Sequence, residues 1–318
     1  MSPADRHSRR VALRRIDPTR RRPLAGSGAL APWLAGCSFG AGTDHSGRHA
    51  PAADPTPLAG LPARPWALVL STGGPRGFVH VGVLRALDEL GVRPDLIVGA
   101  SVGALVAALY CGGLSGASLT RIALEMQPWS MFALAIGAEQ RFSGAPIARF
   151  VAEQLDDTLL QDLRPRCAIV ALRQASREPV VFTRGDAGVA VQASAAIEGR
   201  LTPVWIHGQA HVDPDLVMPL PVRIARRLGA ARVLSIDASA HEDKAPAGAE
   251  RYRDGDRIKR ALTEPDARAA DLNLHPDFGY WVSLGREFRE KAMDAGYRET
   301  MAQREKILRL TRAENSAI

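Results

Sequence analysis

Apolar runs and amphipathic stretches alternate along the middle of this chain in the order expected of strands and helices. The runs WALVL (66–70) and DLIVGA (95–100) have the length and composition of buried strands, and helical patterns follow them at 78–91 and 102–110. Strands that alternate with helices through short links predict parallel strands with right-handed crossovers. We therefore expect an α/β fold with three layers, αβα, around a mainly parallel sheet.

The remaining segments extend this pattern less regularly. Residues 112–165 have a mainly helical pattern, the charged tail at 277–312 is also helical, and further strands are predicted at 167–172, 179–183, 204–212 and 232–238. The chain therefore divides into four parts: a signal-like segment (1–36), a flexible tether rich in Gly, Ala and Pro (37–65), an α/β domain (66–240) and a mainly helical C-terminal extension (241–318).

The basic charge of the chain is concentrated at its beginning. The formal net charge is +7, but Met1 to Arg22 contains eight arginines and two aspartates, so the remaining residues are nearly neutral. Proteins that bind nucleic acid usually carry a basic surface for the phosphate backbone. We therefore expect no nucleic-acid partner, and the basic block needs a different explanation.

An uncharged segment, AGSGALAPWLAGC, follows the basic block and ends in Leu34, Ala35, Gly36 and Cys37. A basic, then apolar, then small-residue order is typical of a secretory signal peptide. The last four residues resemble the lipobox of bacterial lipoproteins, in which the cysteine is lipidated and becomes the new N-terminus. This resemblance implies a lipoprotein of the cell envelope that is held at the membrane surface by its anchor. The alternative is a disordered basic tail on a cytoplasmic protein.

Two cysteines lie within the predicted domain. Cys111 and Cys167 each occupy an apolar stretch, where a free thiol behaves as a small buried hydrophobe. A disulfide between them is the alternative if the protein resides in the envelope.

The sequence GASVG (99–103) fits the G-x-S-x-G pattern of a nucleophile elbow. It stands where a predicted strand gives way to a predicted helix, which is the context that this motif requires. Gly99 and Gly103 remove side chains that would clash at the sharp turn, and the positive end of the helix points at Ser101. We expect Ser101 to be a nucleophile, the alternative being an ordinary turn of small residues.

A glycine-rich turn follows the first predicted strand. Adjacent parallel strands would bring it to the same sheet edge as Ser101, where its backbone N–H groups can stabilise an oxyanion. A phosphate-binding loop is disfavoured because the G-x-G-x-x-G spacing is absent and no acidic residue ends the second strand. The expected oxyanion residues are Gly73, Gly74, Pro75, Arg76 and Gly77; the Arg76 side chain is expected either to bind an anionic head group or to pack against the elbow.

At residues 66–240 the chain resembles the patatin-like phospholipase family. LVLSTGGPRGFVHVGVLRALDELGV is similar to that family's glycine-rich motif and first helix, and GASVG to its serine elbow. The segment HVDPDLVMPLPVRIARRLGA matches its aspartate turn and places the base at Asp213. The resemblance implies a patatin-like catalytic domain that hydrolyses lipid acyl esters with a dyad of Ser101 and Asp213. It implies no histidine base, metal or cofactor.

Three residues depart from the family pattern. Thr72 and Glu198 stand where glycine and proline are usual, and Pro214 replaces the glycine after the catalytic aspartate. Proline fixes its own φ, lacks an N–H and restricts the preceding residue, so a displaced Asp213 is one expectation, with Asp215 as a substitute. Glycine at position 214 would then raise activity. The competing hypothesis is a catalytically impaired envelope lipoprotein of this fold that binds lipid or a protein partner.

Histidines offer the alternative to an aspartate base. His80, His207 and His211 are the histidines expected nearest to the sheet edge, although a histidine on the first helix is more commonly structural. The Ser, Asp, His chain order of α/β-hydrolase triads would require His241 or His275 instead.

We predict that Cys37 carries the membrane anchor. One acyl chain gives only marginal binding, with an association constant of about 10⁴ M⁻¹, whereas the two or three chains of a lipoprotein hold a protein firmly. Mass spectrometry of the envelope fraction should find a lipidated N-terminus at Cys37. An unmodified cytoplasmic protein that begins at Met1 would contradict this prediction.

Overall fold

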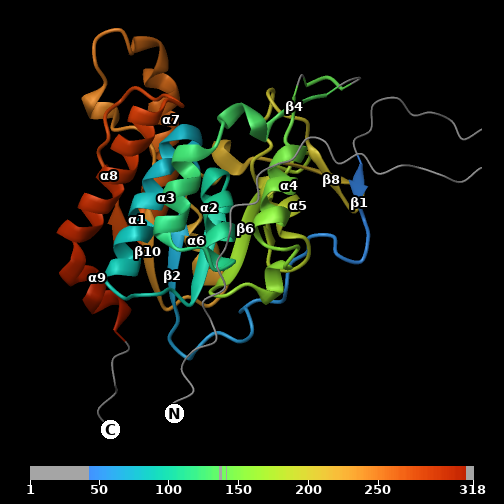
Figure 1. Cartoon of the computed structure of the whole chain (residues 1–318), viewed down its shortest axis with the longest axis horizontal. Coiled ribbons are helices and arrows are strands. Elements are labelled where there is room, and N and C mark those ends of the chain that lie inside the picture. Colours follow the sequence, from blue (N-terminus) through green and yellow to red (C-terminus); the bar gives the residue numbers. More distant parts are fainter. Residues whose placement is uncertain (1–42, 136–137, 141, 313–318) are drawn as a thin grey trace, which may run out of the picture. The chain divides into compact units, whose positions relative to one another are not determined.

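The computed structural model describes residues 43–135, 138–140 and 142–312, and Cys37 and the signal-like segment lie outside this range. A nine-stranded sheet runs through the described part of the chain in the order β1-β8-β9-β6-β3-β2-β10-β11, with β7 also paired to β6 (Figure 1). Strands β6, β3, β2, β10 and β11 are parallel to their neighbours within this group. The strands are β1 Asp44–His45, β2 Trp66–Leu70, β3 Leu96–Ala100, β6 Arg166–Arg173, β7 Pro179–Phe182, β8 Val204–Ile206, β9 Gln209–Val212, β10 Arg232–Ile236 and β11 Leu272–Leu274.

Helices cover both faces of this sheet. The α-helices are α1 Phe78–Glu89, α2 Val102–Cys111, α3 Gly116–Glu125, α4 Ala145–Gln154, α5 Ala187–Ser194, α6 Val222–Arg227, α7 Arg253–Ala269, α8 Arg286–Ala302 and α9 Arg304–Thr311. Short 3₁₀ turns lie at η1 Gly74–Gly77, η2 Pro128–Met131, η3 Leu160–Asp162, η4 Pro214–Leu216, η5 Glu242–Lys244 and η6 Glu250–Tyr252.

The central strands are buried on both faces, which explains their continuous apolar sequences. Leu68 and Ile97 point into a large apolar cluster shared with α1 to α5 and α8. Val69 and Val98, one residue further along, point into a smaller cluster shared with α6. Successive side chains of a strand face opposite sides, so each strand contributes to both layers. The predicted three-layer α/β fold is confirmed.

Some elements differ from the expected pattern. The mainly helical segment 112–165 also contains a small antiparallel hairpin, β4 Ala133–Leu134 with β5 Phe142–Ser143. Residues 43–65, expected to be a flexible tether, lie along the domain: β1 pairs with β8, and Leu58 is buried with its N–H bonded to Leu228. These two-residue strands carry no periodic signal, because pairing with distant segments creates them.

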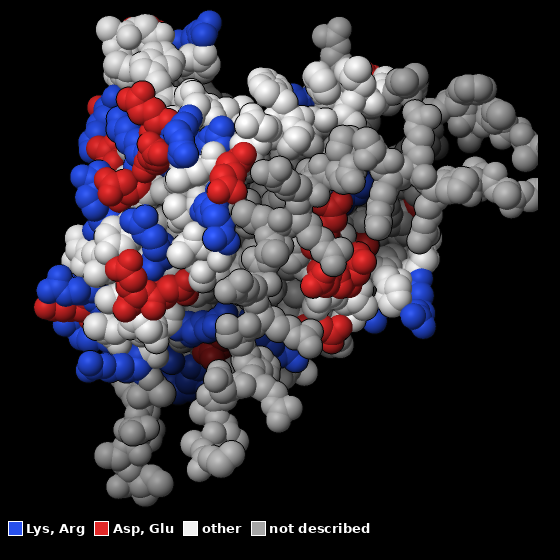
Figure 2. Space-filling view, in the orientation of Figure 1, with Lys and Arg blue, Asp and Glu red and all other residues white. Residues whose placement is uncertain are grey.

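The described C-terminal residues, up to 312, belong to the same compact unit as the predicted α/β domain. Strand β11 extends the sheet beside β10, and α8 packs along α1 and also contacts α3 (Figure 1). Figure 2 shows acidic and basic side chains interleaved over α8 and α9, so this face presents no single-sign patch. None of the described helices combines the length and apolar character needed to cross a bilayer.

The contact between α1 and α8 depends on glycines that let the two helices approach closely. A Cβ atom added at Gly82 would lie 1.8 Å from the Met293 carbonyl oxygen, and one at Gly296 would lie 2.2 Å from the Val79 carbonyl oxygen. Both contacts are with backbone atoms, which cannot move away without separating the helices.

We therefore predict that Gly82→Ala lowers the free energy of unfolding by about 1–3 kcal/mol, as expected for overpacking. Gly255→Ala is the matched control, since a Cβ at Gly255 in α7 would meet no atom within 4 Å. The control should instead raise the free energy of unfolding by about 0.5–1 kcal/mol, because alanine has the higher helix propensity. Urea titration measures both changes, and equal effects of the two variants would contradict the prediction.

Candidate active site

Ser101 occupies a strained turn between β3 and α2. Its φ of 55° and ψ of −123° lie in a region that residues other than glycine seldom adopt. Such a conformation costs about 1–3 kcal/mol and persists only when its surroundings enforce it. Here the Ser101 N–H donates to Ser194 Oγ at 2.8 Å, and Ser194 Oγ donates to the Val170 carbonyl at 2.5 Å. Helix α5 and strand β6 thus hold the elbow.

The two elbow glycines permit close packing around this turn. A Cβ at Gly99 would lie 2.4 Å from the Gly103 carbonyl oxygen, and a Cβ at Gly103 would lie 2.4 Å from the Leu70 carbonyl oxygen. The backbone at the start of α2 therefore packs directly against the backbone at the ends of β3 and β2. Any larger residue at either position would push the helix away from the sheet.

Asp213 lies directly opposite Ser101. It follows the last residue of β9, and Ser101 Oγ donates to Asp213 Oδ2 at 2.6 Å. Asp213 Oδ1 accepts the Asp215 N–H at 2.9 Å, and the Asp213 N–H donates to the Ala196 carbonyl at 3.0 Å. Only 5% of Asp213 is exposed, so both carboxylate oxygens are paired and nearly excluded from solvent.

Burial raises the pKa of Asp213 to about 7, because desolvation penalises the charged form. The neighbouring Asp215 carboxylate acts in the same direction. The Ser101 hydroxyl, the Asp215 N–H and the Lys259 ammonium oppose it by favouring the carboxylate. Asp213 is therefore a stronger base than an ordinary aspartate, yet it is still substantially ionised near neutral pH.

Pro214 does not displace Asp213. Pro214 is the first residue of η4, where a backbone N–H would lack a partner in any case. Asp213 has φ −61° and ψ 133°, an extended conformation that suits a residue before proline, and its carboxylate caps the turn. The expected misplacement of the base is therefore absent, and the proline fits the turn that it begins.

Asp215 is held by other partners and makes no side-chain contact with Ser101. Its Oδ1 accepts hydrogen bonds from Thr72 Oγ1 and from Lys259 Nζ of α7. Thr72, which stands where the family pattern has glycine, thus links the glycine-rich turn to the aspartate turn. The Thr72 N–H strengthens this link by donating to the Pro219 carbonyl at 2.9 Å.

The glycine-rich turn contacts the elbow, but its members differ in what they offer to an oxyanion. Pro75 has no N–H, and the Arg76 N–H already donates to the Gly73 carbonyl at 3.1 Å. Gly77 provides space, since a Cβ there would lie 2.2 Å from Val102 Cγ1. Within the described residues, the N–H groups of Gly73 and Gly74 donate to no protein acceptor. Gly73 and Gly74 are therefore the candidate oxyanion donors whose N–H groups lack a protein partner.

The Arg76 side chain packs against the C-terminal segment. Its Nη2 donates to the Tyr280 carbonyl at 2.9 Å, and the guanidinium lies over the rings of Phe278 and Tyr280. Burial lowers the pKa of Arg76. Of the two roles expected for this side chain, the structure shows the packing role, although the partner is the tail rather than the elbow.

No histidine in the described ranges forms a hydrogen bond with Ser101 or Asp213. His80 is buried and donates to the Ser71 carbonyl at 2.9 Å, and burial lowers its pKa to about 4. The rings of His241 and His275 stack with centroids 3.8 Å apart, and His211 Nδ1 pairs with the Gln209 carbonyl. His207 lies in the turn between β8 and β9.

Two residues of the site escaped sequence analysis. Ser194 is the one hydroxyl residue of α5, whose other residues are apolar apart from Gln192, and this is a weak signal by itself. Lys259 lies outside the resemblance, in a helix whose charged residues look like ordinary solvated side chains. Only their contacts in the folded chain distinguish them.

Cys111 and Cys167 are buried free thiols, as the apolar sequence around each predicts. Desolvation raises the pKa of Cys111, so its thiol stays protonated. Across the described ranges, no cluster of three His, Cys, Asp or Glu side chains is arranged to hold a metal.

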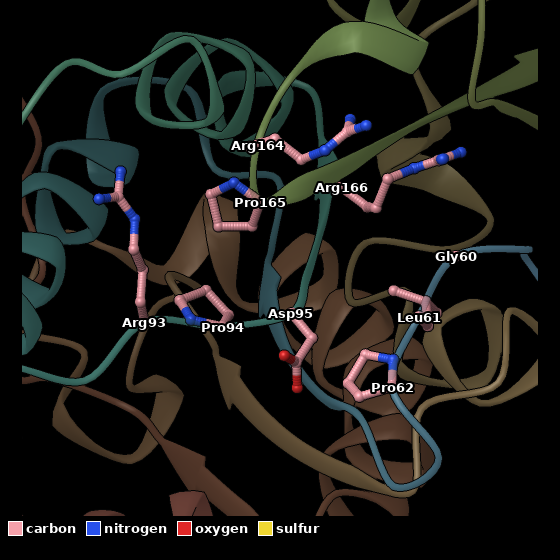
Figure 3. A pocket seen from close by; sticks show the side chains of 9 residues that line it. All are labelled: Gly60, Leu61, Pro62, Arg93, Pro94, Asp95, Arg164, Pro165 and Arg166. Carbon is pink, nitrogen blue, oxygen red and sulfur yellow. The ribbon is translucent and has the colours of Figure 1, made fainter.

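An open depression of about 560 Å³ lies at the opposite edge of the sheet (Figure 3). Asp95 and Arg166 line it at the amino ends of β3 and β6, whereas Ser101 follows the carboxyl end of β3. Figure 3 shows the Arg93 side chain pointing away from those of Arg164 and Arg166. These arginine side chains do not converge on one point (Figure 3). Because the depression lies at the amino ends of β3 and β6, it is separate from the candidate active site at the carboxyl end of β3.

A family model described as patatin-like phospholipase matches residues 68–226, which is half of the chain. The matched range contains the glycine-rich turn, the elbow and the aspartate turn. The chain therefore belongs to the patatin-like phospholipase family.

Curated relatives match the chain over slightly more than half of its length. The neuropathy target esterase sws of Drosophila melanogaster is 30% identical over 185 residues, which are 55% of this chain and 13% of that protein. Human patatin-like phospholipase domain-containing protein 6 is 30% identical over 187 residues, 56% of this chain and 14% of that protein. The chain thus spans a small part of these much longer proteins. Among solved structures, VipD from Legionella pneumophila matches with a TM-score of 0.45 at 15% identity, covering 84% of this chain and 71% of VipD.

We predict that Pro214→Gly brings no increase in kcat/KM, because Pro214 already fits the turn that positions Asp213. The variant should lower the free energy of unfolding by about 0.4–1 kcal/mol, since glycine gives the unfolded chain more freedom. Kinetics on a short-chain nitrophenyl ester and thermal unfolding measure the two effects. A variant several times more active than the parent would show that the proline does impair the site.

Proposed function

We propose that this chain is a lipid acyl-ester hydrolase of the phospholipase type, with Ser101 as nucleophile and Asp213 as general base. The observation that carries the proposal is the 2.6 Å hydrogen bond from Ser101 Oγ to a buried carboxylate at a strained elbow. Family membership and the names of the relatives support lipid esters as the substrate class. A lysophospholipase of Mycosarcoma maydis, NTE1, is 31% identical over 187 residues, 56% of this chain and 10% of that protein.

In the first half of the proposed reaction, ionised Asp213 accepts the hydroxyl proton as Ser101 Oγ attacks the ester carbonyl carbon. The negative charge moves to the carbonyl oxygen, where the N–H groups of Gly73 and Gly74 can donate to it. The positive end of α2 adds to this stabilisation. Collapse of the intermediate breaks the ester bond, and the proton on Asp213 passes to the leaving alcohol.

In the second half, Asp213 removes a proton from a water molecule, which attacks the acyl-enzyme. The C–O bond to Ser101 breaks, the fatty acid leaves, and the serine hydroxyl regains its proton. The raised pKa of Asp213 serves both halves, because a base with a pKa near the working pH accepts and returns a proton most effectively.

Apolar side chains beside the dyad suit an acyl-chain substrate. Leu216, in the turn that begins with Pro214, is 64% exposed, and Ile197 is 40% exposed next to Ala196, whose carbonyl holds Asp213. Exposed apolar groups near a site favour apolar ligands.

The competing hypothesis of a catalytically impaired binding protein was motivated by Pro214. The turn at Asp213 accommodates this proline, so the structure offers no particular support for that hypothesis. We retain the proposal that the protein is held at a membrane surface through Cys37, which rests on the sequence order around that cysteine alone.

We predict that Ser101 and Asp213 act as one catalytic unit. Asp213→Asn should reduce kcat/KM by about 10²–10⁴-fold, the usual contribution of a general base. Ser101→Ala should lose at least as much, and the double variant should be no worse than Ser101→Ala because the two residues act together. A fluorophosphonate probe should label the parent at Ser101 and leave Ser101→Ala unlabelled.

The pH dependence tests the base. Asp213 must be ionised to act, so kcat/KM should fall about tenfold per pH unit below a pH near 7, where Asp213 becomes protonated. His241→Ala and His275→Ala are the controls and should retain most of the activity. Loss of activity in either control with the fold intact would assign the chain to triad hydrolases, and a parent that the probe never labels would contradict a catalytic Ser101.

A further inference from the structure

Helix α7 reaches the candidate active site from outside the part of the chain that matches the family. Its Lys259 Nζ donates to Asp215 Oδ1 at 2.5 Å, and this side chain is only 22% exposed. Thr72 Oγ1 donates to the same oxygen. Asp215 in turn uses its backbone N–H to hold Asp213 Oδ1. One carboxylate thus joins the glycine-rich turn, the aspartate turn and α7.

Other contacts fix α7 independently of Lys259. The buried Asp266 carboxylate accepts hydrogen bonds from the Arg223 guanidinium at both oxygens, with Nη2 to Oδ2 at 2.8 Å, and its Oδ1 also accepts the backbone N–H of Arg223 in α6. Arg260 lies 3.6 Å from the buried Asp237. Loss of the Lys259 ammonium therefore leaves the helix anchored at two further points.

A second contact from the same face of α7 reaches the other half of the site. Asp256, one turn before Lys259, accepts a hydrogen bond from the Tyr280 hydroxyl. The Tyr280 carbonyl and ring hold Arg76, which belongs to the glycine-rich turn. One helical turn of the C-terminal extension thus connects to both the oxyanion turn and the base turn.

We propose that Lys259 is a positioning residue for the reaction, acting through Asp215 to hold the Asp213 turn in place and to keep Asp213 ionised. This inference rests on the proposed function of Ser101 and Asp213. Lys259 forms no hydrogen bond with Ser101 or Asp213. It acts on Asp213 in two ways: its ammonium pairs with the Asp215 carboxylate, and its positive charge favours the ionised form of Asp213.

The charges around Asp213 set the direction of the effect. The polar and charged groups facing it are the Ser101 hydroxyl at the start of α2, Asp215 in η4 and Lys259 in α7. Asp215 raises the pKa of Asp213, and Lys259 lowers it. Without Lys259 the Asp215 charge is unopposed, so Asp213 is protonated over a wider pH range and the base form is lost near neutrality.

The test is Lys259→Met, with kcat/KM on a soluble nitrophenyl ester measured across the pH range. The acid limb should move upward by about one pH unit, which is roughly a tenfold loss at pH 6 and a smaller loss at pH 9. Lys259→Arg should keep the parent profile. Arg257→Met is the matched control: it removes a positive charge from the same helix, but Arg257 pairs at 3.3 Å with the exposed Asp254, away from the site.

A double variant tests the route through Asp215. In Lys259→Met with Asp215→Asn both charges are gone, so the acid limb should return toward that of the parent. Thermal unfolding of every variant separates this effect from loss of the fold. An unchanged acid limb in Lys259→Met, an equal shift in Arg257→Met, or no recovery in the double variant overturns the inference.

These outcomes are distinct from failure of the proposed function. A Ser101→Ala variant that is as active as the parent would refute the dyad itself. If Ser101→Ala abolishes activity but Lys259→Met leaves the pH profile of kcat/KM unchanged, only the role of Lys259 is refuted.

Discussion

A carboxylate that accepts a proton from serine has to be removed from water far enough to be a useful base, yet it must remain ionisable at the working pH. The base role proposed for Asp213 agrees with both conditions, because Asp213 is hydrogen-bonded to Ser101 and almost completely buried. The sheet makes the pairing possible, because β9 and β3 flank β6 and bring the ends of both strands to one region. Ser194, Ala196 and the Asp215 N–H each hold one of the two partners of this hydrogen bond.

Backbone strain and close packing hold the serine in place. Ser101 has an unfavourable backbone conformation at the elbow. The hydrogen bond to the Ser194 hydroxyl and the close packing of α2 against β2 and β3 hold it there. Both depend on residues that add no bulk, at Gly99 and Gly103. Stability contributed by the buried core offsets the strain at the elbow, as is common where strain is kept for function.

The C-terminal segment contributes to the structure around the candidate active site. It lies beyond the range matched by the family, yet it adds β11 to the sheet, covers α1 with α8, and reaches both turns of the site through α7. Asp256 and Lys259 stand one helical turn apart, so a single rigid element links the Arg76 and Asp215 sides. A helix is well suited to this because its side-chain spacing is fixed.

The sequence by itself determined the alternation of strands and helices, the elbow motif at Ser101 and the glycine-rich turn before it, and the family resemblance added the aspartate turn at Asp213. These signals are local. Apolar periodicity, glycines at a turn and the family motifs can each be recognised within a short stretch of consecutive residues. For the oxyanion turn the sequence indicated five residues, and only the folded chain shows that the Arg76 N–H already has a partner in the Gly73 carbonyl.

Tertiary structure alone decided the rest. Whether Pro214 displaces Asp213 depends on the turn that β9 and Ala196 impose, and a proline in a sequence does not reveal the turn it will begin. Strands β1 and β11 form because they pair with β8 and β10. Strands of two or three residues are too short to carry a periodic sequence pattern. Lys259 looks like any solvated lysine on a charged helix. Its partner Asp215 is 44 residues away, and only folding brings two such distant charges together.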